Sequence, residues 1–498
     1  ADPCPSSRWR PAPVAVVISQ RGRAADAIVV GSGPNGLAAA VTLARAGLAV
    51  HVIEGADTPG GGCRTQELTL PGFHHDVCSA VHPLAAASPF FRGMDLPALG
   101  VTLRTPKVAF AHPLDGGQVA AVAGSVDETA GGLGPDAGAY RRLLAPLVRD
   151  VDLTLPDILA PLRSPPRHPV AMARFGLDGV LPASLLARWF RTDQGQALLA
   201  GVAAHAMLPL TAPVTGAFGL VLTMTAHAVG WPVVEGGSAR LTDALVAELT
   251  SLGGTLETAR WIGSLESVPA ARAILLDVTP RQLADMAGER ISARYRRALA
   301  RFRYGAGVCK VDWALSGPVP WQAAACREAG TIHLGGTLAE IARSEAQVAA
   351  GQHPERPYCI VAQPGVADPT RAPAGCQTLW GYCHVPLGSA VDMTGRIEAQ
   401  IERFAPGFGD LILARSVKTA ADLERYNPNY VGGDINGGAG TLLQTVFRPT
   451  PRWNPYRTPL PRVYLCSSST PPGGGVHGMC GAGAAGTVLA DLGVKAPR

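Results

Sequence analysis

The pattern of apolar and polar residues from Asp26 to Glu54 predicts a strand, a glycine turn, a helix and a second strand. The first strand is the apolar run "AIVV", and the helix follows as "LAAAVTLARAG". The second strand, "AVHVIE", ends on the carboxylate of Glu54. This alternation is typical of a parallel sheet that is covered by helices.

Two later segments show a similar pattern of predicted strands and helices. Glu235 to Pro280 contains a helical spacing over Leu241–Leu252 and the apolar strand "AILLDV". Arg462 to Gly493 contains a strand, a glycine-rich turn and a closing helix. The fold class predicted is α/β, with one nucleotide-binding domain built from three segments (26–85, 231–295 and 426–493). A substrate domain is inserted twice, at 86–230 and 296–425, and residues 1–25 form a disordered extension.

The two inserted blocks differ in pattern. Residues 86–230 have helical spacing broken by prolines. Residues 300–425 contain the strand-like runs "GVCKVDWAL" and "TLWGYCHVP" and one amphipathic helix near 389–404. We therefore expect an α+β substrate domain.

The longest uncharged stretch runs from Gln194 to Val234, and prolines at 209, 213 and 232 interrupt it. A bilayer-spanning helix is therefore disfavoured, and we interpret the stretch as buried helices that line an apolar cavity. Peripheral membrane contact is the alternative. The composition agrees with a large apolar interior, since 47% of residues are hydrophobic and 16% are charged.

Charge and cysteine usage narrow the class of protein. The net charge is only +5, and the chain contains no basic run with interleaved aromatic residues, so we expect no nucleic-acid partner. Ten cysteines occur without a C-x-x-C pair, which favours single thiols in a reducing, cytoplasmic compartment and no metal site. The apolar run "PVAVVI" near the N-terminus is too short for a secretory signal; a disordered extension is favoured over an arginine-rich targeting arm.

Gly31, Gly33 and Gly36 form a G-x-G-x-x-G motif in the context that a dinucleotide site requires. Gly31 permits the tight turn, Gly33 lets a pyrophosphate approach the backbone, and Gly36 lets helix and strand pack closely. Glu54, 18 residues after Gly36, is placed to bind ribose hydroxyls and would repel the 2′-phosphate of NADP. Two further copies of the motif, beginning at Gly473 and Gly481, lie too near the C-terminus to open such a unit.

The motif is followed by "GGGCRT" at Gly60–Thr65, and the chain continues with "GWPVVEGGSARLTDAL", "NPNYVGGDINGG" and "STPPGGGVHGMCG". This combination resembles the phytoene-dehydrogenase-like flavoproteins of the amine oxidase superfamily. It also resembles the branch that includes pyridine nucleotide-disulphide oxidoreductase domain-containing protein 2. The resemblance implies a Rossmann-like FAD-binding domain of the amine oxidase and phytoene desaturase type, with an interleaved α+β substrate domain.

The resemblance also implies which residues would contact FAD. Those expected at its ADP half or pyrophosphate are Gly31, Gly33, Asn35, Gly36, Glu54, Gly61, Gly62 and Arg64, with Ile262, in the strand after Gly253-Gly254, at the adenine. Those expected at the pyrophosphate, ribityl chain or flavin ring are Ser467, Ser468, Gly475, Val476 and Gly478. The chain departs from the family pattern at Ser467, where many relatives have glycine, and at Pro471, where many have histidine.

The function expected is an FAD-dependent oxidoreductase that desaturates an apolar substrate by hydride transfer to flavin N5. Oxygen, a quinone or another acceptor would reoxidise the flavin, and the oligomeric state stays open. The alternatives are an amine or amino-acid oxidase on the same fold and a flavin-holding protein without turnover. The sequence shows no catalytic dyad.

Several residues are candidates for a role near the flavin. His477 and His384 are the acid–base candidates, and Lys310 is a candidate for holding a water at N5. His205 and His227 are interpreted as hydrogen-bonded core histidines. A covalent flavin link at Cys63 or Cys480 competes with simple packing. Trp321, Trp380 and Tyr382 are expected to border an apolar substrate cavity.

Overall fold

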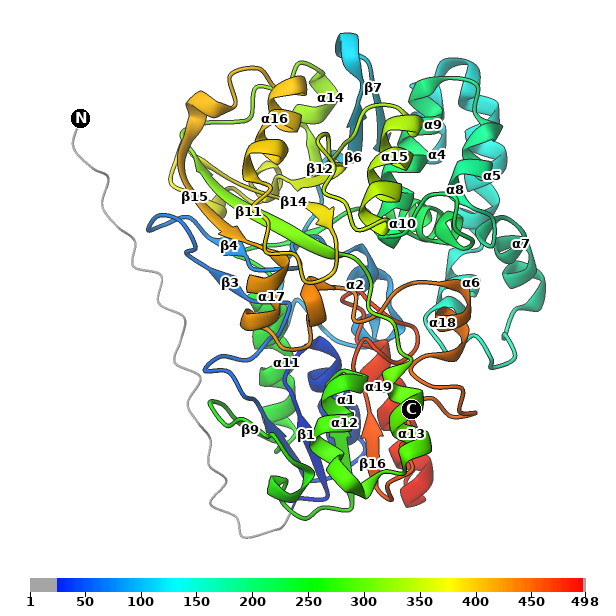
Figure 1. Cartoon of the computed structure of the whole chain (residues 1–498), viewed down its shortest axis with the longest axis vertical. Coiled ribbons are helices and arrows are strands. Elements are labelled where there is room, and N and C mark those ends of the chain that lie inside the picture. The colour runs from blue at the N-terminus through cyan, green and yellow to red at the C-terminus, as the bar shows by residue number, and fades with distance from the viewer. Residues whose placement is uncertain (1–24, 496–498) are drawn as a thin grey trace.

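The computed structural model describes residues 25–495, so the predicted extension at 1–25 lies almost entirely outside the described residues. The lower half in Figure 1 is built on a five-stranded parallel sheet. Its strands come from three distant parts of the chain, in the order β16 (Val463–Leu465), β10 (Ala273–Leu276), β1 (Ala27–Val30), β2 (Val50–Ile53) and β9 (Thr255–Glu257). The predicted fold class is confirmed.

Helices cover both faces of this sheet. One face packs on the helix that follows the glycine turn, α1 (Pro34–Arg45), which lies against α11 (Ala239–Ser251) and α19 (Met479–Leu492). The other face packs on α12 (Pro280–Ala287) and α13 (Ala293–Ala300). β1 and β10 are largely buried on both faces, which explains why they appear in the sequence as the continuous apolar runs "AIVV" and "AILL".

The upper half contains a seven-stranded sheet (Figure 1). Its neighbours pair antiparallel except β12 with β6, which are parallel. The strand order is β15 (Ile412–Lys418), β11 (Gly307–Leu315), β14 (Gln377–Val385), β13 (Cys359–Ala362), β12 (Ala329–Leu334), β6 (Val108–Pro113) and β7 (Val119–Ala123). The predicted strands "GVCKVDWAL" and "TLWGYCHVP" are confirmed as β11 and β14.

The block 86–230 is rich in helices and also contains a β-hairpin that its sequence pattern did not predict. It contributes the hairpin β6–β7, closed by the turn Asp115–Gly117, to the edge of the upper sheet. All six residues of β6 are buried, so the alternation that marks a strand is missing there. The Asp-Gly-Gly turn was the available signal.

Helices complete the upper half. α14 (Ala324–Arg327), α15 (Leu338–Ala349) and α16 (Thr394–Phe404) accompany the sheet, and α16 confirms the predicted amphipathic helix. Six further helices come from the first inserted block: α4 (Val126–Gly131), α5 (Ala137–Arg149), α6 (Val151–Ile158), α7 (Pro169–Gly179), α8 (Ala183–Leu186) and α9 (Asp193–Ala203). The long helix α10 (Thr215–Val229) then returns the chain towards the lower half.

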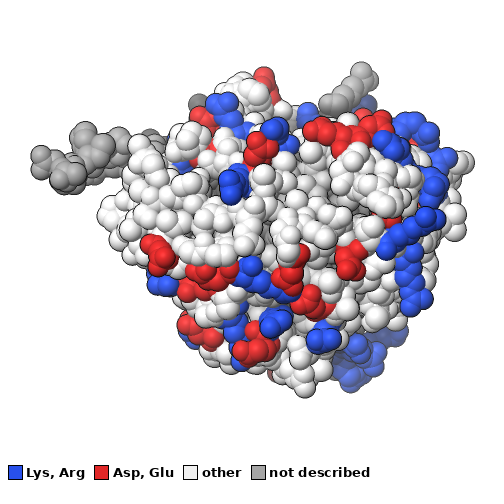
Figure 2. Space-filling model, turned by 90° about the horizontal axis from the view of Figure 1, so that it is seen from above, with Lys and Arg blue, Asp and Glu red and all other residues white. Residues whose placement is uncertain are grey.

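Short elements connect the halves. They are β3 (Thr65–Gln66), β4 (His75–Asp76), α2 (Pro83–Ala87), α3 (Pro89–Arg92), β5 (Leu103–Arg104), β8 (Val233–Val234), α17 (Ala420–Tyr426) and α18 (Leu442–Phe447). Figure 2 shows acidic and basic side chains interspersed over one face, with broad areas free of both and basic side chains gathered along one edge.

The uncharged stretch 194–234 becomes α9, α10 and the loops around them. Within residues 25–495, no single helix has both the length and the apolar character needed to cross a membrane. The pair Pro169–Gly179 and Ala183–Trp189 reaches that length and composition only together, across an 89° bend.

Candidate functional site

One large cavity lies between the two halves of the molecule and has a volume of about 1080 Å³. It begins at the carboxyl ends of β1, β2 and β10, where Val30, Glu54 and Asp277 line it. It extends to an apolar region bordered by Phe175, Val221 and other side chains. Ligand cavities in proteins usually measure about 300–1,000 Å³, so this space suits a dinucleotide together with a second molecule.

The glycine turn forms one wall of this cavity at the start of α1. Gly31 has φ +99°, a conformation that favours glycine. A Cβ on Gly36 would lie 2.2 Å from the carbonyl oxygen of Gly31, so helix and strand approach more closely than any other residue permits. The N-terminus of α1, with Pro34 in its first turn, therefore opens directly onto the cavity and can bind an anion.

Glu54 is held rigidly at the end of β2. Its Oε2 accepts hydrogen bonds from the backbone and hydroxyl of Ser32, at 2.8 and 2.6 Å, and its Oε1 accepts one from Ala56 N at 2.9 Å. Arg64 Nη2 lies 3.7 Å from Oε1 and donates to the carbonyl of Thr58 at 2.6 Å. Glu54 and Arg64 both line the cavity, and Glu54 has further lone pairs for ribose hydroxyls.

A second carboxylate, Asp277, lies at the end of β10 and faces the glycine turn. Its Oδ2 accepts a hydrogen bond from Gly36 N at 3.1 Å, and a Cβ on Gly33 would lie 2.8 Å from the same atom. Burial raises the pKa of Asp277 from 3.8 to about 7; the amides of Gly36 and Gly33 oppose the shift, and the charge of Glu54 adds to it. Asp277 is thus mainly neutral below pH 7 and ionised above it.

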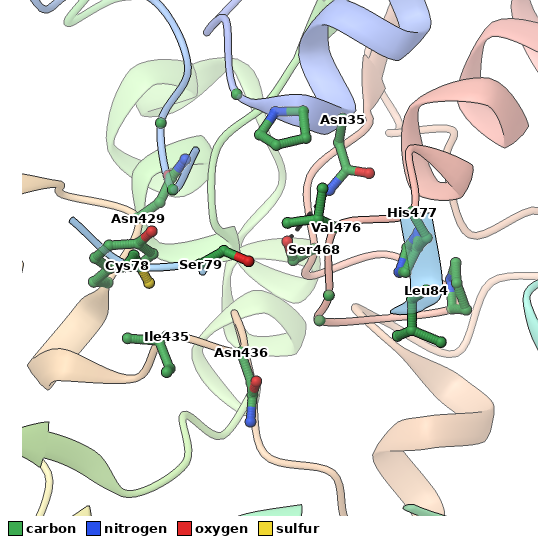
Figure 3. Close-up of a pocket in the computed structure, with 18 of the residues that line it drawn as sticks. Asn35, Cys78, Ser79, Leu84, Asn429, Ile435, Asn436, Ser468, Val476 and His477 are labelled. Atoms are coloured by element: carbon green, nitrogen blue, oxygen red, sulfur yellow. Dashed lines mark hydrogen bonds between the residues drawn. The ribbon is translucent and has the colours of Figure 1, made fainter. Parts of the chain in front are cut away.

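Figure 3 shows the part of the cavity where side chains from α1, from the 427–436 loop and from the 467–477 loop converge. Asn35 Nδ2 donates to Ser468 Oγ at 3.3 Å, and Asn429 Nδ2 donates to the carbonyl of Asp277 at 2.8 Å. The Oδ1 atoms of Asn35 and Asn429 are buried and have no partner among the described residues. Two orphaned acceptors beside a cavity fit a ligand that carries hydroxyl or N–H donors.

The cavity brings most of the predicted cofactor residues together. Those that line it are Gly31, Gly33, Asn35, Glu54, Gly61, Gly62, Arg64, Ile262, Ser468, Gly475 and Val476. Ile262 does so from an irregular segment, because β9 ends at Glu257; its placement in a strand is corrected. Gly36, Ser467 and Gly478 do not line the cavity.

These three residues have packing positions instead. Gly36 lies against Gly31, and a Cβ on Gly478 would lie 2.5 Å from the ring of Phe90. Ser467 Oγ donates to the carbonyl of Val278 at 2.7 Å. Each of them shapes the backbone next to the cavity.

His477 lines the cavity, yet both of its ring nitrogens are engaged. Nε2 lies 3.2 Å from the carbonyl of Gly473, which can only accept, so Nε2 carries the proton. Nδ1 then accepts a hydrogen bond from Met479 N at 3.0 Å. Burial lowers the pKa of His477 to about 4, so the neutral ring fixes the shape of the glycine-rich turn.

Of the other residues that the sequence suggested for a role near the flavin or the substrate, some line the cavity and others lie outside its lining. His384 lies outside the cavity lining, and its Nδ1 lies 2.8 Å from Glu345 Oε2. Lys310 is buried beside Asp312, behind the ring of Trp380. His205, Trp380 and Tyr382 line the cavity, whereas Lys310, Trp321, His227, Cys63 and Cys480 do not.

The thiols of Cys63 and Cys480 are expected to be unreactive. Both are buried, and burial raises the pKa of Cys63 well above its ordinary value and that of Cys480 to about 11. A protonated thiol is a poor nucleophile, so neither side chain is prepared for a covalent bond to a cofactor.

Sequence reasoning missed Asp277, Asn429 and Asn436, all of which line the cavity. The signal for Asp277 was its position directly after the apolar run "AILL", because ligands bind at the carboxyl ends of parallel strands. The two asparagines lie in an irregular glycine-rich loop, where no periodicity marks them.

These features define a mixed α/β fold with a Rossmann-like nucleotide-binding sheet, of the kind found in amine-oxidase-type proteins. The model of the NAD(P)-binding Rossmann-like domain family matches residues 29–92. The chain is 27% identical over 558 aligned positions to pyridine nucleotide-disulfide oxidoreductase domain-containing protein 2 of Rattus norvegicus, with 94% of each chain covered.

Solved structures agree on the fold. An oxidoreductase from Methanosarcina mazei superimposes with a TM-score of 0.61 at 14% identity, covering 94% of this chain and 99% of that one. Cyclohexylamine oxidase from Brevibacterium oxydans superimposes with a TM-score of 0.56 at 17% identity and the same coverage.

Proposed function

We propose that this protein is an FAD-dependent oxidoreductase of the phytoene-dehydrogenase-like type that dehydrogenates an apolar organic molecule. The observation that carries the proposal is the large cavity, whose lining is polar around the glycine turn and includes the apolar side chains of Met172, Phe175 and Val221. A dinucleotide at the polar end would bring its reactive ring towards the apolar end. Bound FAD supplies the hydride acceptor.

The chain's own residues divide the work of holding FAD. The N-terminus of α1 is placed for the pyrophosphate, and Glu54 is placed for ribose hydroxyls. The unpartnered oxygens of Asn35 and Asn429 would accept hydrogen bonds from the ligand. These contacts account for the polar groups that the fold buries around an internal space, which supports FAD over a purely structural cavity.

The apolar end would bind the substrate and exclude water. Its wall includes side chains of α6, α7 and α10, among them Ile158, Met172, Phe175, Val221 and Leu222. Water exclusion matters because it strengthens electrostatic interactions inside the site and prevents side reactions of reactive intermediates. An oxygen molecule or a quinone is proposed as the electron acceptor.

An amine oxidase is the second candidate, favoured by the similarity in fold to cyclohexylamine oxidase. A panel of long-chain alkenes, ketones and amines, mixed anaerobically with the flavin-loaded protein, separates the two. We expect an apolar, uncharged compound to bleach the flavin. Bleaching by amines with hydrogen peroxide release on aeration would favour the amine oxidase, and no bleaching by any compound would favour a flavin-holding protein without turnover.

A further inference from the structure

Two histidines contact each other at the wall of the cavity's apolar part, one lining the cavity and one behind it. His205 follows α9 and lines the cavity, and His333 lies on β12 directly behind it. Their Nε2 atoms lie 2.9 Å apart, and the two rings meet edge to face. One of these nitrogens must donate and the other must accept, so the pair has a defined order of protons.

The surroundings of His333 decide that order. His333 is fully buried, and its Nδ1 has no hydrogen-bond partner among the described residues. The neighbouring His112 cannot serve as a donor to it, because the His112 Nε2 proton goes to the carbonyl of Gly336 at 2.7 Å. A bare Nδ1 lone pair on His333 costs less than a buried, unpaired N–H, so the proton of His333 belongs on Nε2.

His205 must then accept at Nε2 and carry its own proton on Nδ1. That nitrogen is not among the buried, unpartnered atoms, and His205 is only partly buried, so its N–H is directed to the cavity. Burial, with a smaller contribution from nearby His384, lowers the pKa of His205 to about 3. The ring is therefore a neutral hydrogen-bond donor at physiological pH.

The rest of this wall is also uncharged. Trp380 and Tyr382 line it, and the indole N–H of Trp380 is buried without a partner among the described residues. The neighbouring charges are paired behind the wall, Lys310 with Asp312 and Glu345 with His384. The His205 N–H is the donor that this wall presents, and no carboxylate among the described residues lines it, so the wall suits an acceptor oxygen and disfavours an ammonium group.

We propose that His205 is a substrate-positioning residue whose Nδ1–H binds a carbonyl oxygen carried on an otherwise apolar skeleton. The substrate class is therefore an apolar ketone, aldehyde or ester rather than a pure hydrocarbon or an amine. That this ligand is the substrate rests on the proposed function. That the His205 Nδ1–H is a hydrogen-bond donor in the cavity does not depend on the proposed function.

The first test reads the proton directly. Nitrogen-15 NMR of histidine-labelled wild-type protein, with the signal assigned through His205→Phe, should show protonated Nδ1 and bare Nε2. A protonated Nε2 and an unprotonated Nδ1 on His205 would overturn the proposal. The tautomer is measured on the wild-type protein and does not require bound flavin; the His205→Phe variant serves only to assign the signal.

The second test compares two probes of the same shape, 2-octanone and 2-methyl-1-octene, which differ in C=O against C=CH₂. Their dissociation constants follow from the ligand-induced rise in Tm. We expect His205→Phe to reduce the preference for the ketone by about tenfold, and His205→Asn, which keeps an N–H donor, to restore part of it. The control His227→Phe changes a histidine outside the cavity lining and should leave the preference unchanged.

An unchanged preference in His205→Phe would contradict the proposal. Failure of the proposed function is a separate result, because a protein that holds no flavin still yields the tautomer and the preference. A flavin-loaded protein that treats both probes alike would overturn the histidine assignment alone.

Discussion

Replacing Asp277 with asparagine is expected to remove the pH dependence of FAD binding. In the wild-type protein the pKa of Asp277 is raised to about 7 by burial, so the side chain ionises as the pH rises through that value. The ionised carboxylate would lie at the N-terminus of α1, where the pyrophosphate of FAD is proposed to bind. We therefore expect the Kd for FAD to rise by on the order of tenfold per pH unit above about pH 7.

The direction of this change in Kd depends on which protonation state of Asp277 binds FAD more tightly. A neutral Asp277 accommodates the phosphates and an ionised one repels them, so binding takes up a proton at alkaline pH. The groups that face Asp277 do not mimic this titration: Cys466 and Cys480 have raised pKa values, and Glu54 is common to the wild type and the variant. Asparagine keeps the acceptor for Gly36 N–H and carries no charge.

The measurement is the quenching of FAD fluorescence by apoprotein at several pH values between about 6 and 9. Asp285→Asn is the matched control, because Asp285 also lines the cavity but is exposed. That control should retain the wild-type profile. A pH profile in Asp277→Asn that equals the wild type would show that another group governs binding.

Asp277 also links folding to pH. Its folded-state pKa lies above its ordinary value of 3.8, so its contribution to stability is fully present below about pH 4 and is lost as the pH rises through about 7. The gain in Tm of apoprotein Asp277→Asn should accordingly increase between those pH values.

Replacing Gly481 with alanine is expected to disrupt the packing of α19 on α1. A Cβ at this position would lie 1.8 Å from the carbonyl oxygen of Asn35 and 2.8 Å from Ala39 N, both backbone atoms of α1. The two helices would have to move apart where they pack together. Because the glycine turn leads directly into α1, it would be displaced as well. We expect a loss of about 3 kcal/mol in the free energy of unfolding, together with loss of FAD.

Gly486 provides the control within the same helix. It is exposed, and a Cβ there would meet nothing within 4 Å. Gly486→Ala should be neutral or should stabilise the protein by about 0.5–1 kcal/mol through helix propensity. Denaturant unfolding of both variants measures the difference, and equal stabilities would mean that α1 and α19 are less tightly packed than the structure shows.

The lower sheet was predictable because its strands are buried and its turn is chemically marked. Gly31, Gly33 and Gly36 fall between apolar runs, and Glu54 ends the second strand. The hairpin β6–β7 was not found, because both faces of β6 are buried and its period of two disappears. Its place beside β12 depends on pairing with residues more than two hundred positions away, which local patterns do not report.

The glycine motif in the sequence predicted the polar end of the candidate site. It did not predict which residues contact each side chain there. Asp277 and Gly36 are brought together by the pairing of β10 with β1. His384 and Lys310 were candidates by residue type, but their strands turn them towards Glu345 and Asp312. His205 was interpreted as a core histidine, and its contact with His333 shows that it is both hydrogen-bonded and open to the cavity.

FAD is proposed to bind in the large cavity without a covalent bond to the protein. The most direct test is the visible spectrum of the purified protein, followed by acid precipitation and a spectrum of the supernatant. We predict oxidised-flavin bands near about 370 and 450 nm that move into the supernatant, because Cys63 and Cys480 are protonated and lie outside the cavity lining. A colourless protein that also fails to bind added FAD would contradict the account, and colour retained in the pellet would contradict the non-covalent attachment.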